Sequence, residues 1–196
     1  MNFNFLRHFL RARLWEFLGQ NGGASRAYRK AFELNPRSMQ SACHLGVLAS
    51  DRGDNAQAIR WFECVVALAP EDPKAWFNLG FAREQVGDMT AAAVALRRAV
   101  ALAPTLDRAW YGLGLAEAGR GLHAEAAEAL QEAVKLQPMN GLAHYQLGMA
   151  YFHLRETART EETITTLARF DPRHARLLMQ DSGRADLLHL LPEALR

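Results

Sequence analysis

The sequence is short of cysteine and of long apolar runs. Two cysteines, Cys43 and Cys64, among 196 residues are too few for a disulfide framework, and their spacing matches no metal knuckle. No run of 18 or more apolar residues occurs, so we expect no transmembrane helix. The apolar first 19 residues are interrupted by arginines and lack a small-residue cleavage site, so we expect no signal peptide. A cytoplasmic protein fits these absences best.

The chain also lacks an excess of charge of either sign. It carries 23 Lys and Arg against 21 Asp and Glu, a net charge of +2, which argues against a dedicated nucleic-acid binder. With 49% hydrophobic and 22% charged residues, it has the composition of a soluble globular protein. The one local excess lies in residues 1–37, which hold seven basic and two acidic groups. We interpret it as a solvated helix pair, with an anchor for an acidic partner or an anionic membrane surface as the alternative.

Proline is scarce too, but its spacing is regular. Five of the seven prolines recur at intervals of 34 residues, namely Pro36, Pro70, Pro104, Pro138 and Pro172. Two columns of glycine share this period. The first is Gly19, Gly53, Gly87 and Gly121, and the second is Gly46, Gly80, Gly114 and Gly148. A period of this length is typical of stacked helical hairpins.

The unit that begins at Pro73 shows why such a repeat folds as two helices. Pro73 suits the first turn of a helix, where its missing N–H costs nothing. Gly87 can end that helix in a left-handed conformation, and Asp88 can cap the next one. Gly80 and Ala92 lack bulk, so the two helix axes can approach closely. Because no hairpin can bury both of its faces alone, neighbouring units must stack.

The segments Trp76-Phe77-Asn78-Leu79-Gly80 and Trp110-Tyr111-Gly112-Leu113-Gly114 resemble the signature of the tetratricopeptide repeat (TPR) family. The resemblance implies an all-α, right-handed superhelix of five helix-turn-helix repeats plus a C-terminal capping helix. The repeats would occupy 1–38 (a degenerate N-terminal repeat), 39–72, 73–106, 107–140 and 141–174, followed by a cap and leucine-rich tail at 175–196. We expect a bacterial member of the family, with the first helix of each repeat on the concave face.

Each of these first helices carries a second stripe of side chains beside the one that packs within the repeat. The candidate residues of a peptide-binding groove on this stripe are Lys74, Phe77, Asn78, Phe81, Arg108, Tyr111, Tyr145 and Met149. Aromatic rings are favoured at binding surfaces, and two basic groups suit an acidic residue or a C-terminal carboxylate. Packing between neighbouring first helices is the alternative, and the simpler one for Phe81 and Met149. The carboxylate clamp known in this family is largely absent, because Cys43 and Val47 stand where it has Lys and Asn.

No catalytic, cofactor or metal site is predicted. Gly112 and Gly114 lack the third glycine of a dinucleotide loop and fall within an expected helix. Cys43 and His44 are neighbours on a helix and point about 100° apart, so they cannot easily form a nucleophile–base pair. The histidines are scattered without metal-ligand spacing. We therefore expect no enzyme activity and no cofactor.

The sequence predicts a non-enzymatic scaffold or adaptor that binds a peptide or helix of a partner protein in its concave groove. Two alternatives stay open. The leucine-rich run 187–191 is interpreted either as a terminal cap or as a docking segment for self-assembly. The arginines Arg7, Arg11 and Arg13 could instead place the chain on a membrane surface. No nucleic-acid partner is expected.

Overall fold

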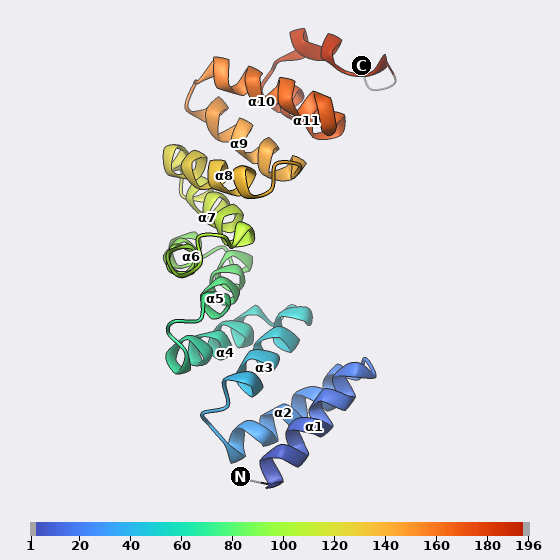
Figure 1. The fold of residues 1–196 in the computed structure, drawn as a ribbon, viewed down its shortest axis with the longest axis vertical. Coiled ribbons are helices and arrows are strands. Elements are labelled where there is room, and N and C mark those ends of the chain that lie inside the picture. Colours follow the sequence, from blue (N-terminus) through green and yellow to red (C-terminus); the bar gives the residue numbers. More distant parts are fainter. Residues whose placement is uncertain (1–2, 194–196) are drawn as a thin grey trace. The chain divides into compact units, whose positions relative to one another are not determined.

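The computed structural model describes residues 3–193, and every regular element within them is a helix. Each first helix packs against the helix that follows it, from α1 with α2 to α9 with α10. This confirms the all-α, helix-turn-helix architecture predicted from the 34-residue period. The chain divides into two compact units, Met1–Leu102 and Ala103–Arg196, whose helices are coloured along the sequence in Figure 1.

Unit 1 contains three helix pairs. The helices are α1 (Phe3–Phe17), α2 (Asn21–Leu34), α3 (Met39–Asp51), α4 (Asn55–Leu68), α5 (Pro73–Gln85) and α6 (Met89–Leu102). Unit 2 contains two pairs and a terminal segment. Its elements are α7 (Asp107–Gly119), α8 (His123–Leu136), α9 (Gly141–His153), α10 (Thr157–Phe170), α11 (Pro172–Asp181) and a 3₁₀ helix, η1 (Ala185–Leu190). None of the helices among the described residues is long and apolar enough to cross a membrane.

A left-handed residue follows the first helix of each pair. Four of the five are the glycines of the first column, including Gly87 with φ of 78°. Arg155 holds the fifth position with φ of 60°, where its Cβ makes the conformation strained. The next helix is then capped where an aspartate is available, as Asp54 and Asp88 show. The backbone N–H of Ala91 donates to Asp88 Oδ1 at 3.1 Å, as the sequence predicts.

The second glycine column marks the closest approach between paired helices. A Cβ built on Gly80 would lie 2.6 Å from Leu96 Cγ and 3.3 Å from the backbone oxygen of Ala92. Gly46 and Gly114 face the second helix of their own pairs equally closely. The absence of a side chain therefore allows the packing of these three pairs, as expected for Gly80 and Ala92. Gly148 of the last pair faces Leu178 of α11 instead.

A ring N–H ties the start of the first helix to the preceding turn in three pairs. Trp76 Nε1 and Trp110 Nε1 each donate to the carbonyl oxygen of the proline six residues earlier, at 2.8 Å. His144 takes the same position in the next pair, where its Nε2 lies 3.0 Å from the Pro138 carbonyl oxygen. The His144 ring is buried and packs where the other two pairs have tryptophan.

The C-terminal segment closes the open edge of unit 2. Leu178 and Met179 of α11 are fully buried with Ile164 and Leu167 of α10. The chain then breaks at Gly183, whose φ is 70°, and η1 folds back on the same cluster. Leu191 is 2% exposed within it. The leucine-rich run thus packs on its own unit, which supports its interpretation as a cap.

Candidate functional site

The predicted site residues lie on the first helices α5, α7 and α9, and we call them the first-helix stripe. In unit 1 the stripe runs along α5, whose opposite face is buried against α4 and α6. Lys74 is exposed in the first turn of α5, where Asp72 Oδ1 accepts a hydrogen bond from its backbone N–H at 2.9 Å. Phe77 and Asn78 are half-buried, and Phe81 is 43% exposed.

The two phenylalanine rings of α5 form a continuous apolar surface. Phe77 and Phe81 are four residues apart, so they lie on the same side of the helix. Their rings are stacked, with centroids 6.5 Å apart and planes inclined by 24°. Phe81 therefore leaves much of a large apolar side chain in contact with solvent.

The neighbouring first helix, α3, contributes Cys43 to the packing of the same unit. Cys43 packs beside the buried Ala42, Val65 and Ala75, which brings α3 next to α5. Burial and the charge of Asp72 raise the pKa of the Cys43 thiol, so it is less reactive than an ordinary cysteine. These features give Cys43 a packing role.

In unit 2 the stripe begins on α7. Arg108 is exposed in the first turn and has no ion pair within residues 3–193. Tyr111, one turn later, is half-buried and packs against the cluster of Ala126, Leu130 and Tyr151. α7 also contacts α9 directly, so the two first helices of this unit are neighbours.

α9 differs from α5 and α7 because the terminal helix α11 packs over its stripe. Tyr145 and Met149 lie against the buried cluster of α10 and α11. The Tyr145 hydroxyl donates to Asp181 Oδ2 at 2.7 Å, and its ring lies 6.3 Å from that of His174. The hydrogen bond to Asp181, together with burial and the charge of the same carboxylate, raises the pKa of Tyr145 to about 12. Tyr145 thus has a partner within its own unit.

Sequence reasoning missed the role of Asp181. It lies outside the 34-residue period, and only the observation that α11 continues the stack of helices would have placed it beside Tyr145. No group of three or more His, Cys, Asp or Glu side chains within the described part of the chain could hold a metal ion.

Comparisons with known proteins agree with the fold. A family model described as "Tetratricopeptide repeat" matches residues 9–73 and 111–175, more than half of the chain, and a second model of the same description matches residues 45–109. A search of curated proteins gave no match.

Solved structures with the same arrangement of helices span nearly the whole chain. A structure of MamA protein has a TM-score of 0.79 at 25% identity, covering 95% of this chain and 98% of that one. MamA from Desulfovibrio magneticus RS-1 has a TM-score of 0.76 at 22% identity, covering 95% and 99%. YrrB, described as a TPR protein with an unusual peptide-binding site, has a TM-score of 0.81 at 20% identity, covering 90% of each chain.

Proposed function

The chain belongs to the tetratricopeptide repeat family, and we propose that it is a scaffold or adaptor that binds a segment of a partner protein on the first-helix stripe. Repeats of this family generally serve as protein-interaction modules and not as enzymes. The observation that carries the proposal is the solvent-exposed ring of Phe81 stacked beside Phe77. Exposed aromatic rings next to charged groups match the docking of a helix or an extended peptide.

The charges on the stripe indicate the chemistry of the partner. Lys74 in unit 1 and Arg108 in unit 2 are both exposed, and neither forms an ion pair within the described residues. A partner segment that carries an acidic side chain or a C-terminal carboxylate would form charge-assisted hydrogen bonds with either of them. A peptide ligand is also what the description of YrrB states for that protein, with which this chain shares its fold.

The test uses the protein as bait in an extract of its native cell. The variant Phe77→Ala/Tyr111→Ala removes one ring from each unit, and the control Val94→Ala truncates a side chain that is 59% exposed on the second helix α6. We expect the double variant to lose about tenfold or more of the partner captured, since an interface anchor contributes about 1–3 kcal/mol. Equal capture by the wild type, the control and a correctly folded double variant would contradict the proposal.

A second candidate function has support from α1, which carries an unpacked apolar face. We call Phe3, Leu10, Leu14 and Phe17 the α1 outer stripe; each is between 57% and 87% exposed. Their spacing places them on one side of the helix, away from the residues that pack on α2. The outer face of a terminal repeat is ordinarily polar. The apolar outer face of α1 is therefore a candidate binding surface.

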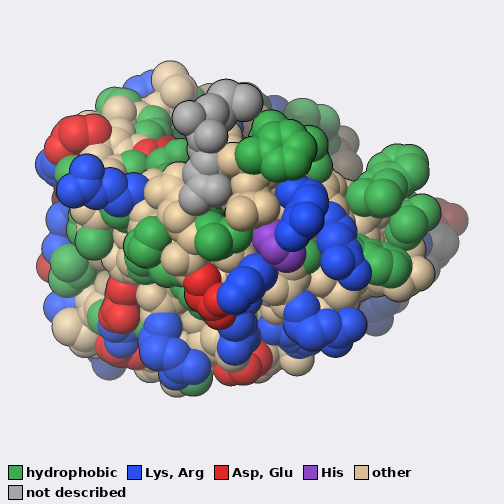
Figure 2. Space-filling view, turned by 90° about the horizontal axis from the view of Figure 1, so that it is seen from below, with side chains coloured by type: hydrophobic (Ala, Val, Ile, Leu, Met, Phe, Trp, Pro, Cys, Tyr) green, Lys and Arg blue, Asp and Glu red, His purple; other side chains and the backbone are tan. Residues whose placement is uncertain are grey.

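Basic side chains border the α1 outer stripe. Arg7, Arg11 and Arg13 are exposed beside it, and Lys and Arg side chains gather next to hydrophobic ones on the face seen in Figure 2. The only acidic residue of α1, Glu16, accepts a hydrogen bond from the Tyr28 hydroxyl at 2.6 Å and is therefore engaged with α2. An apolar stripe bordered by arginines suits an anionic membrane surface.

Vesicle sedimentation distinguishes this candidate from the first. The protein is mixed at low salt with vesicles of phosphatidylserine and phosphatidylcholine, and with vesicles of phosphatidylcholine alone. Binding to the anionic vesicles that is lost in Leu14→Ser and in Arg7→Ala/Arg11→Ala, but kept in the matched surface variant Val94→Ser, would support a membrane-surface role. Absence of binding by the wild type would remove it and leave the first proposal unchanged.

A further inference from the structure

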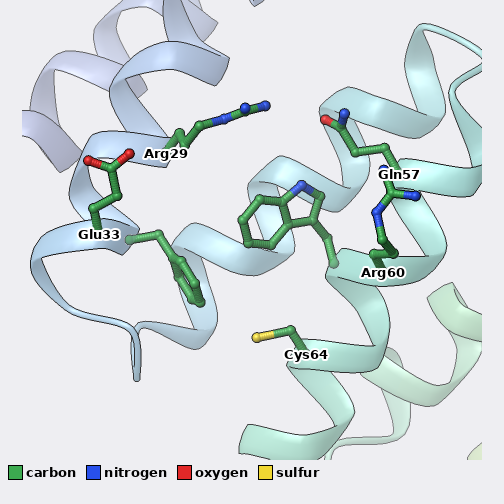
Figure 3. A pocket seen from close by; sticks show the side chains of 7 residues that line it. Arg29, Glu33, Gln57, Arg60 and Cys64 are labelled. Atoms are coloured by element: carbon green, nitrogen blue, oxygen red, sulfur yellow. The ribbon is translucent and has the colours of Figure 1, made fainter.

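A cavity of about 450 Å³ opens between the second helices α2 and α4 of unit 1, on side chains that the first-helix stripe does not use. In Figure 3, Arg29 of α2 extends toward Gln57 of α4 across it. Glu33 of α2 and Arg60 and Cys64 of α4 also line the cavity. The volume lies within the range of about 300–1,000 Å³ found for small binding pockets.

Two aromatic side chains form the apolar part of the cavity. Phe32 and Trp61 pack edge to face, with ring centroids 5.1 Å apart and planes inclined by 85°. Both depart from the pattern of the other repeats. The residues at the position of Trp61 in the other repeats are Ala27, Ala95, Ala129 and Thr163. The equivalent helix pairs elsewhere in the chain therefore pack without an indole. Trp61 packs against the buried clusters of unit 1 and also presents part of its ring to the cavity.

The rim of the cavity is basic because its two arginines are not neutralised by nearby carboxylates of the described residues. Neither Arg29 nor Arg60 forms an ion pair within residues 3–193. The one acidic group there, Glu33, is held by Lys30 at 2.9 Å. A second cavity of about 440 Å³ shares Arg29 and Glu33 and adds Arg26 and Arg52, so the basic surface continues along α2.

An unsatisfied acceptor lies in the same wall. Gln57 Nε2 donates to Asp54 Oδ2 at 3.3 Å, which fixes the orientation of the amide. Gln57 Oε1 is then buried without a hydrogen-bond partner among residues 3–193. A buried polar atom left unpaired costs about 1–3 kcal/mol.

From these observations we propose that the α2–α4 cavity binds an acidic, extended peptide segment of a partner protein. A large apolar side chain of the peptide packs on Trp61 and Phe32, and its carboxylates pair with Arg29 and Arg60. A flat membrane surface cannot enter the cavity, whereas an extended chain supplies both of these groups. The site is separate from the first-helix stripe, so one chain could hold two partner segments at once.

The experiment selects ligands without assuming their sequence. A phage library of random twelve-residue peptides is panned on the wild type, and selected peptides are synthesised and measured by fluorescence polarisation. We expect them to combine Asp or Glu with a large apolar residue. Affinity should fall tenfold or more in Arg29→Glu/Arg60→Glu and in Trp61→Ala, a variant that introduces the residue of three other repeats. The control Arg169→Glu/Arg173→Glu changes the net charge equally on exposed residues of unit 2 and should bind within twofold of the wild type.

The alternative outcomes are distinct. The proposal is overturned if panning yields no binders, if the peptides lack acidic residues, or if either cavity variant binds them as tightly as the wild type. Tighter binding of a labelled twelve-nucleotide oligouridine, lost in the same variants, would overturn it in favour of RNA. Retained binding of the selected peptides by Phe77→Ala/Phe81→Ala would show that the α2–α4 cavity binds them independently of the first-helix stripe.

Discussion

Replacing Gly80 by alanine tests the close packing between the paired helices α5 and α6. An added Cβ would lie 2.6 Å from Leu96 Cγ and 3.0 Å from its Cδ2. Carbon atoms in favourable contact are about 3.5–4.0 Å apart, so Leu96 or the helix must move by about 1 Å. Overpacking of this kind costs about 1–3 kcal/mol, while the higher helix propensity of alanine returns about 1 kcal/mol. We expect Gly80→Ala to reduce the free energy of unfolding by about 0–2 kcal/mol.

Gly22→Ala is the matched control for this substitution. Gly22 is also in a helix of unit 1, but a Cβ there meets only Arg26 Nη1 at 3.9 Å. It should raise stability by about 1 kcal/mol, which separates the two variants by about 1–3 kcal/mol. The assay is urea denaturation followed by far-ultraviolet circular dichroism. If Gly80→Ala proved as stable as Gly22→Ala, the close approach of α5 and α6 would not depend on glycine.

Three further predictions concern single side chains. Arg155→Gly should raise the free energy of unfolding by about 1 kcal/mol in the same assay, because glycine adopts the positive φ without strain; an unchanged or lower value would contradict the left-handed assignment. Burial and the charge of His153 lower the pKa of His123 below its unfolded value. The unfolded state therefore binds this proton more readily as the pH falls below about 6.5. The urea concentration at the midpoint of unfolding should therefore decrease between about pH 7 and pH 5. The decrease should be smaller in His123→Asn, and an equal decrease in both proteins would refute this prediction. Asp181→Asn should return the pKa of Tyr145 from about 12 toward the ordinary tyrosine value in an ultraviolet absorbance titration, whereas no change would show that the hydrogen bond is absent.

The parts of the structure that repeat were predictable from the sequence. The 34-residue period fixes which residues share a position, so one unit predicts the others. Pro73 begins α5, Gly87 ends it with a positive φ, and Asp88 caps α6. His144 could be assigned a packing role because it stands where two other repeats have tryptophan.

The parts that do not repeat were missed for the same reason. The period cannot show that Asp181, beyond the last repeat, accepts a hydrogen bond from Tyr145. Nor does it show which apolar residues of a terminal helix stay exposed, as Phe17 does. The cavity beside Trp61 could have been suspected from a tryptophan in a column of small residues, but its basic rim depends on two helices meeting. Departures from a repeat carry the information that the period itself cannot supply.

The central claim is that a partner segment lies on the first-helix stripe. A photoreactive benzoylphenylalanine replaces Phe81 in one protein and Val94 in another, so that a first and a second helix of the same pair are compared. Both proteins are irradiated in native cell extract, and cross-linked peptides are identified by mass spectrometry. We predict that a partner segment cross-links to position 81 and not to position 94. Cross-links to position 94 alone would contradict the account.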